Sequence, residues 1–124
     1  MKEYKELNYQ EKYACFSLYP KESLLDEDWS IRLQAYRLFG FTKEALLDKD
    51  GDVRLCGYYS LGFTEEAKHD EDWGIRLQAY RSLGFTEESL DDNFEDIRIE
   101  AGIYFSIKDS WANGEKNENK NYIY

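Results

Sequence analysis

The sequence predicts an all-α protein, an α-solenoid of about five 22-residue repeats with two helices each. Three observations support this class: a strict 22-residue period, helical spacing of apolar residues within each period, and a glycine that recurs at one place in three periods. Pro20 is the only proline, so little in the chain interrupts a helix. Two short helices cannot bury an apolar face alone, so the repeats are expected to stack.

The period is clearest in a tripeptide in which arginine lies between two apolar residues. This tripeptide is found at 31–33, 53–55, 75–77 and 97–99. A Gly-Phe-Thr sequence follows the first three of them, at 40–42, 62–64 and 84–86. Residues 26–47 and 70–91 are identical at 16 of 22 positions. This degree of internal identity predicts structurally equivalent units.

The period also sets the expected domain organisation. The predicted repeats are about 4–25, 26–47, 48–69, 70–91 and 92–113. The first and last are the most divergent, which is typical of capping repeats. We therefore expect a single α-solenoid domain over residues 1–114, followed by a polar C-terminal tail at 115–124.

Each repeat is expected to contain a long helix and a shorter one. In the third repeat, Asp50 can cap a helix that places Val53 and Leu61 on one apolar stripe. Gly62 then ends this helix in a left-handed conformation, and Thr64 begins the short helix. The predicted long helices are about 29–39, 51–61, 73–83 and 95–105.

Two motifs resemble known repeat families. The pattern D-x-D-x-x-[IV]-R-x-x-A-x-x-x-x-G, at 26–40 and 70–84, resembles the second-helix signature of HEAT-like repeats. The Phe-Thr-x-Glu-x-Leu stretch at 41–46 is similar to leucine-rich repeat variant (LRV) proteins. The resemblance implies a right-handed superhelix that binds other macromolecules, and it implies no reaction.

The HEAT-like resemblance also implies a ladder of ion pairs between neighbouring units. In such families the first aspartate of the motif and the arginine six places later form this ladder. The corresponding pairs here are Asp26/Arg32, Asp48/Arg54, Asp70/Arg76 and Asp92/Arg98. We expect these residues to fix how successive units stack, rather than to bind an anion.

Composition excludes several function classes. The chain has 16 Lys+Arg against 26 Asp+Glu, a formal charge of −10, which argues against direct binding of nucleic acid or of an anionic membrane. No apolar run approaches the roughly 20 residues that a membrane helix needs, and the N-terminal residues do not resemble a secretory signal. These features predict a cytoplasmic protein.

The residues that usually carry chemistry are few. Cys15 and Cys56 are 41 residues apart, form no CxxC motif and have only His69 as a possible co-ligand, so no metal site is expected. No nucleophile, base and acid are arranged as in a known catalytic motif. The sequence therefore predicts a protein that is not an enzyme and needs no cofactor.

A second apolar stripe on the long helices is the candidate functional site. At 100° per residue, Ile31, Ala35 and Leu38 face the expected core, and aromatic residues and leucines repeat on the opposite side. With two flanking arginines, the candidate partner-binding residues are Trp29, Leu33, Tyr36, Arg37, Leu55, Tyr58, Tyr59, Trp73, Leu77, Tyr80 and Arg81. We call this set the aromatic–leucine stripe. In the last repeat it continues with Phe94, Ile99 and Ile103.

The stripe has two interpretations. An exposed groove of this composition would bind another protein, or would be buried in a homodimer. Alternatively, lateral packing between short helices buries the stripe as a second core. Sequence periodicity alone leaves both open.

Acidic residues gather at one edge of the repeats and support an alternative function. They are Glu27, Asp28, Asp50, Asp52, Glu71, Asp72, Asp92, Glu95 and Asp96. Such a row can mimic nucleic-acid charge, as in a phage-encoded inhibitor that occupies the basic groove of a nucleic-acid-binding protein. The simpler interpretation is that acids favour helix N-termini and keep an aromatic-rich protein in solution.

Overall fold

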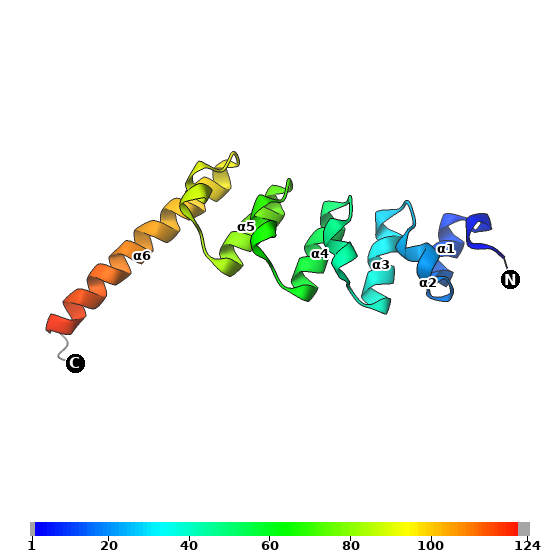
Figure 1. Cartoon of the computed structure of the whole chain (residues 1–124), viewed down its shortest axis with the longest axis horizontal. Coiled ribbons are helices and arrows are strands. Elements are labelled where there is room, and N and C mark those ends of the chain that lie inside the picture. Colours follow the sequence, from blue (N-terminus) through cyan, green and yellow to red (C-terminus); the bar gives the residue numbers. More distant parts are fainter. Residues whose placement is uncertain (1, 122–124) are drawn as a thin grey trace. The chain divides into compact units, whose positions relative to one another are not determined.

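The computed structural model describes the backbone of residues 2–121 and the side chains of residues 2–113. Over this part of the chain every regular element is a helix (Figure 1). Six are α-helices: α1 (Tyr9–Cys15), α2 (Pro20–Leu24), α3 (Trp29–Phe39), α4 (Gly51–Leu61), α5 (Trp73–Leu83) and α6 (Glu95–Asn121). Five are short 3-10 helices, η1 (Tyr4–Glu6), η2 (Phe16–Leu18), η3 (Lys43–Leu47), η4 (Glu65–His69) and η5 (Glu87–Asp91).

The 22-residue spacing is confirmed. α3, α4 and α5 each have 11 residues, and they cover the predicted ranges 29–39, 51–61 and 73–83. The short helices after each Gly-Phe-Thr are present, as five-residue 3-10 helices. The last long helix does not end near 105, because Ser106 stands where a stop glycine is expected, and α6 continues to Asn121. Residues 122–124 of the predicted tail lie outside the described residues.

Aspartate side chains begin three of the long helices. Asp28 accepts a hydrogen bond from the Ser30 amide, while Asp50 and Asp72 each accept from two amides of the first turn. These bonds satisfy backbone donors that have no partner within the helix. α6 has Phe94 at the equivalent place, whose side chain cannot accept such a bond; the Phe94 amide donates to the side chain of Asp92, as the Asp28, Asp50 and Asp72 amides donate to Asp26, Asp48 and Asp70.

Glycines end the same three helices. Gly40, Gly62 and Gly84 have φ values of +105°, +103° and +106°. The predicted positive φ is therefore confirmed, but ψ values of 141–143° place the glycines outside the αL region expected for a Schellman stop. This extended backbone at positive φ is close to a region reserved for glycine. The chain consequently leaves each helix in an extended conformation.

Each long helix packs against the short element that precedes it: α3 on α2, α4 on η3, α5 on η4 and α6 on η5. Small residues permit close contact between a long helix and its short element. For α4 and η3, a Cβ added to Gly57 would lie 3.2 Å from the Cβ of Ala45. The equivalent residues of the short elements, Ser23, Ala45, Ala67 and Ser89, are completely buried. The pair that packs together therefore spans the boundary between two sequence repeats.

The chain divides into two compact units, Met1–Gly62 and Phe63–Tyr124. The core of the first unit contains Leu33, Tyr36, Ala45 and Val53. The core of the second contains Leu77, Tyr80 and Ile97. In each unit, residues of one long helix pack against a residue of the next long helix, Val53 or Ile97.

The core-facing stripe predicted for the long helices extends further toward their C-terminal ends than the core does in the structure. Leu38 and Leu61 are 55% and 46% exposed, although both were expected in the core. The short helices α2 and η3 have five residues each and span about 8 and 10 Å, whereas the 11-residue helices α3 and α4 that pack on them span about 16 Å, so part of each long helix stays uncovered. No helix within residues 2–121 is long and apolar enough to cross a membrane.

Candidate partner-binding surface

Arg32 joins three segments of the first unit. Its Nε and Nη2 donate to the two carboxylate oxygens of Asp48 at 2.8 and 2.7 Å. Its Nη1 donates to the carbonyl oxygens of Asp26 and Glu27 at 2.7 and 3.0 Å. The side chains of Arg32 and Asp48 are each only 6% exposed. A buried, bidentate pair of this kind fixes geometry strongly.

Arg76 repeats this arrangement in the second unit. Its Nε and Nη2 donate to the two Asp92 oxygens, each at 3.0 Å. Its Nη1 donates to the carbonyl oxygens of Asp70 and Glu71. The expected ladder therefore exists, but its partners differ from the predicted ones. The carboxylate comes from 16 residues later in the sequence, and the aspartate six places earlier supplies a main-chain carbonyl.

The other two ladder arginines show the same main-chain contact. Arg54 donates to the carbonyl oxygen of Asp48 at 2.8 Å, and Arg98 donates to that of Asp92 at 2.6 Å. All four ladder arginines thus hold the loop before their own long helix. Through these bonds the four guanidinium groups connect the loop to the helix.

The ladder carboxylates have shifted pKa values. Burial by itself raises the pKa of Asp48, but hydrogen bonds from Arg32 and the Asp50 amide, together with the charge of Arg32, outweigh burial and lower this pKa. The pKa of Asp92 is lowered in the same way, with burial opposed by Arg76 and the Phe94 amide. Both groups are therefore ionised in the folded protein near neutral pH.

The N-terminal segment completes the ladder where the repeat has no arginine. Asp26 pairs with Lys12 at 3.3 Å and accepts a hydrogen bond from the Tyr4 hydroxyl. Burial, followed by the bond to Asp26, raises the pKa of Tyr4, so this tyrosine remains a neutral donor. Sequence analysis did not identify these two partners. The repeat pattern gave no signal for them, because Gln10 stands 16 residues before Asp26, where the pairs of Arg32 and Arg76 would place an arginine.

In the first unit the aromatic–leucine stripe is partly core. Leu33, Tyr36 and Tyr58 are buried, and Leu55 is half-buried. Tyr36 stacks on Phe41, with ring centroids 5.6 Å apart. The exposed members are Trp29 at 43% and Tyr59 at 61%, together with Arg37.

The second unit divides its part of the stripe in the same way. Leu77 and Tyr80 are buried, and Tyr80 stacks on Phe85. Trp73 is 44% exposed, and one face of its indole stacks on Phe94 with centroids 4.1 Å apart. Arg81 is exposed and forms a bidentate pair with Glu100 at 2.9 and 2.5 Å. Leu33, Leu77 and the buried tyrosines belong to the core, which favours the second-core interpretation for them.

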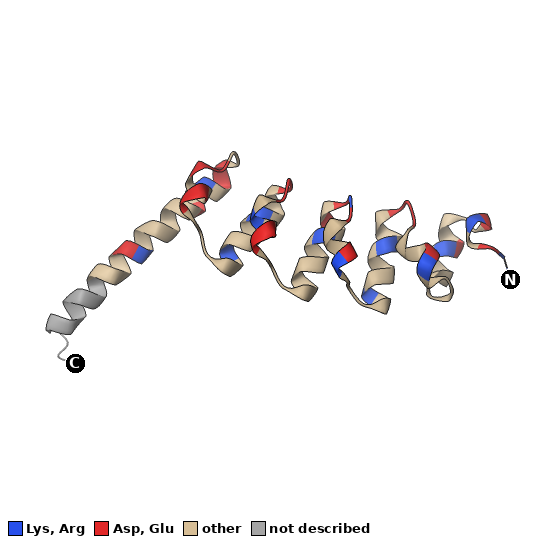
Figure 2. Ribbon diagram, viewed as in Figure 1, with Lys and Arg blue, Asp and Glu red and all other residues tan. Residues whose placement is uncertain are grey.

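Acidic residues are concentrated in the loops that precede the long helices (Figure 2). Three of the predicted acids, Asp28, Asp50 and Asp72, are N-caps, and Asp92 belongs to the ladder. Glu27, Asp52, Glu71, Glu95 and Asp96 are exposed. The acidic edge therefore contains structural residues and outward-facing residues in similar numbers.

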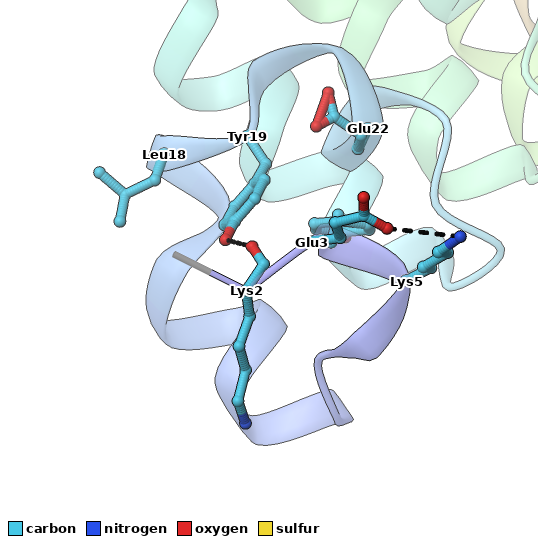
Figure 3. A pocket seen from close by; sticks show the side chains of 7 residues that line it. Lys2, Glu3, Lys5, Leu18, Tyr19 and Glu22 are labelled. Carbon is cyan, nitrogen blue, oxygen red and sulfur yellow. Dashed lines mark hydrogen bonds and ion pairs between the residues drawn. The ribbon is translucent and has the colours of Figure 1, made fainter.

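A hollow at the N-terminal end has a volume of about 610 Å³ (Figure 3). Leu18, Tyr19 and Glu22 contribute to its wall. The polar groups that the figure joins already have partners: Lys5 pairs with Glu3 at 3.3 Å, and the Tyr19 hydroxyl donates to the carbonyl oxygen of Lys2.

Among the side chains of residues 2–113, no three His, Cys, Asp or Glu are placed to hold a metal ion, and no buried polar atom lacks a hydrogen-bond partner. The sequence matches no protein-family model, and neither a curated protein nor a solved structure shows significant similarity to it.

Proposed function

We propose that the protein is a right-handed α-solenoid, similar to HEAT-like and LRV proteins, that binds another protein and catalyses no reaction. Regular helix and 3-10 helix units support the proposal, as does an arginine ladder that repeats in each compact unit. Repeats of this kind present residues from the same position of successive helices on one surface. We place the protein in the cytoplasm and expect it to work without a cofactor.

The observation that carries this proposal is the exposure of the stripe's largest aromatic side chains. Trp29, Tyr59 and Trp73 remain exposed next to leucines and tyrosines that are buried. Tryptophan, tyrosine and arginine dominate the binding energy of many protein interfaces. Arg37 and Arg81 lie at the same place of α3 and α5, one in each unit, and add two such side chains.

The test is capture of partners from the native cell with the full chain as bait. We expect Trp29→Ala/Tyr59→Ala to lose the partner that the wild-type protein retains. The matched control is Leu25→Ala/Leu47→Ala, because these leucines are more than 80% exposed but lie outside the stripe. Partners that are identical for wild type, stripe variant and control would refute this binding surface. Equal melting temperatures would show that both variants are folded.

The exposed acids favour a second candidate function, an acidic decoy for a basic nucleic-acid-binding protein. Its binding would depend on Glu27, Asp52 and Asp96, which face solvent without capping a helix. Reversal of these three charges should then abolish binding, and affinity should fall steeply with salt. Binding that survives both changes would exclude the decoy. Asp28, Asp50 and Asp72 must stay unchanged in this experiment, since they cap long helices.

A further inference from the structure

The arginine ladder has an open end at Arg98. In Arg32 and Arg76, Nη1 donates to main-chain carbonyls, while Nε and Nη2 donate to a carboxylate of the next repeat. The Nη1 of Arg98 makes the same main-chain bond, to the carbonyl oxygen of Asp92. Its Nε and Nη2 donate to no acceptor among the side chains of residues 2–113. Arg98 therefore presents the edge that binds a carboxylate in the other two arginines.

The chain does not supply a carboxylate at the expected place. The acid that pairs with Arg32 or Arg76 lies 16 residues later, and Gly114 stands at that place after Arg98. In the other repeats a glycine ends the long helix, and a short helix follows it. α6 continues to Asn121 instead, so residues 99–121 cannot fold back on Arg98 (Figure 1).

Two neighbours of Arg98 are also exposed, although their equivalents are buried. Ile99 is 51% exposed, whereas Leu33 and Leu77 are each 6% exposed. Gly102 stands where α3 and α5 have a buried tyrosine, and a Cβ added to it would meet no atom within 4 Å. At 100° per residue, the three residues lie within about 100° of one another. We call Arg98, Ile99 and Gly102 the ladder end.

In the first unit, α3 shows which segment covers this face. Arg32 pairs with Asp48, and Leu33 packs in one cluster with Val53. The aspartate precedes α4, and the valine lies in its first turn. One segment therefore supplies both the carboxylate and the apolar side chain, five residues apart.

In the second unit, α5 is covered by the same kind of segment. Arg76 pairs with Asp92, and Leu77 packs in one cluster with Ile97, five residues after that aspartate. The fold thus uses one form of recognition twice. Its chemistry is a helix start with an aspartate five residues before a β-branched apolar residue.

A second copy of the chain does not offer such a segment. The β-branched residues of its four helix starts are Ile31, Val53, Ile75 and Ile97, and each is at most 1% exposed. They are already used inside their own fold. The segment that fits the ladder end therefore belongs to a different protein.

We propose that the ladder end binds a helix start of another protein that carries an aspartate five residues before valine or isoleucine. The aspartate accepts hydrogen bonds from Nε and Nη2 of Arg98, and the β-branched side chain packs on Ile99. A bidentate pair of this kind fixes the orientation of the bound segment. Gly102 leaves space that a tyrosine fills in α3 and α5. The site includes neither Trp29 nor Tyr59, so it does not depend on the proposed function.

A synthetic peptide of residues 41–61 serves as the probe, because it contains the segment that covers α3 in the native fold. It is titrated under reducing conditions into the ¹⁵N-labelled full chain and followed by NMR. We expect the Nε–H resonance of Arg98 to shift, with a dissociation constant below about 1 mM. The same peptide with Asp48→Asn should bind at least about 3-fold more weakly, since the amide carries no charge.

Variants of the full chain locate the bound peptide. Arg98→Gln should weaken binding as much as the Asp48→Asn change in the peptide, and the two changes together should cause no further loss. Arg37→Gln is the matched control, because it removes the same charge from an exposed arginine of α3 and should leave binding unchanged. A wild-type peptide that does not bind at about 1 mM would overturn the proposal. Equal weakening by the two arginine variants, or equal binding of the two peptides, would also overturn it.

Discussion

At the scale of single residues, three glycines and two arginines have the clearest structural roles. Gly40, Gly62 and Gly84 hold a backbone conformation with positive φ that other residues rarely adopt. Arg32 and Arg76 each connect a carboxylate to two main-chain carbonyls. The same residue types recur every 22 residues because each repeat needs the same helix stop and the same connection.

Replacement of Gly40 by alanine should destabilise the protein by about 1–3 kcal/mol, because a Cβ at positive φ strains the backbone. The matched control is Gly102→Ala, the same chemical change inside a helix with no atom near the added Cβ. It should stabilise by up to about 1 kcal/mol. Urea denaturation of the two variants measures both free energies of unfolding. Effects of the same sign would contradict the role assigned to Gly40.

Removal of a ladder carboxylate should cost more than removal of an exposed one. Asp48→Ala leaves the Arg32 guanidinium buried without its counter-ion, so we expect a loss of about 3–5 kcal/mol. Glu100→Ala removes the partner of a bidentate pair that is partly exposed, and should cost about 1 kcal/mol or less. Chemical denaturation under identical conditions compares the two variants. Equal losses would show that burial of the ladder pair adds nothing to the free energy of unfolding.

At the scale of elements, the ladder connects consecutive helices and makes their packing depend on pH. Arg32 lies on α3, whereas Asp48 follows η3 and precedes α4. The bond therefore holds the loop that precedes α4 to the preceding long helix, α3. Its strength depends on ionised carboxylates, since a protonated carboxyl would lose the charge-assisted bond.

Unfolding free energy should fall in acid. The folded pKa values of Asp48 and Asp92 lie below the ordinary value of about 3.9, so both groups stabilise the fold above that pH. This stabilisation is lost as pH decreases through the lowered folded pKa. Urea denaturation between about pH 7 and pH 2 should show a plateau above about pH 5 and a decline below about pH 4. Asp48→Asn should begin from a lower plateau and decline less, and a parallel curve for the variant would exclude this carboxyl as a cause.

At the scale of the whole molecule, the regular repetition predicts that the chain still folds after loss of one complete repeat. Deletion of residues 48–69 joins Leu47 to Asp70, which occupies the same position of the repeat as Asp48. Because each repeat contacts mainly its neighbours, we expect a folded helical protein of lower stability. Deletion of residues 48–58 removes half a repeat and should abolish cooperative unfolding. Circular dichroism during thermal unfolding distinguishes the two, and equal behaviour would contradict a repeat architecture.

The burial of the candidate binding residues was predicted less well than the fold. Periodicity placed the aromatic–leucine stripe on one side of the long helices, and in the structure its members differ in burial. Leu33 and Tyr36 pack against the next element, whereas Trp29 and Tyr59 stay exposed. The helical wheel gives only the direction of a side chain. Whether a neighbouring element covers that direction depends on the length and position of the short helices.

By itself, the sequence determined the helical class, the 22-residue period, the limits of α3, α4 and α5, and the need for glycine at their ends. These features depend on local backbone preferences and capping, which neighbouring residues control. Only the tertiary structure decided that Arg32 pairs with Asp48, that Leu38 is exposed and that α6 keeps an uncovered apolar face. Those outcomes depend on how far each short helix extends along its neighbour, which is a distance in space that sequence spacing does not contain.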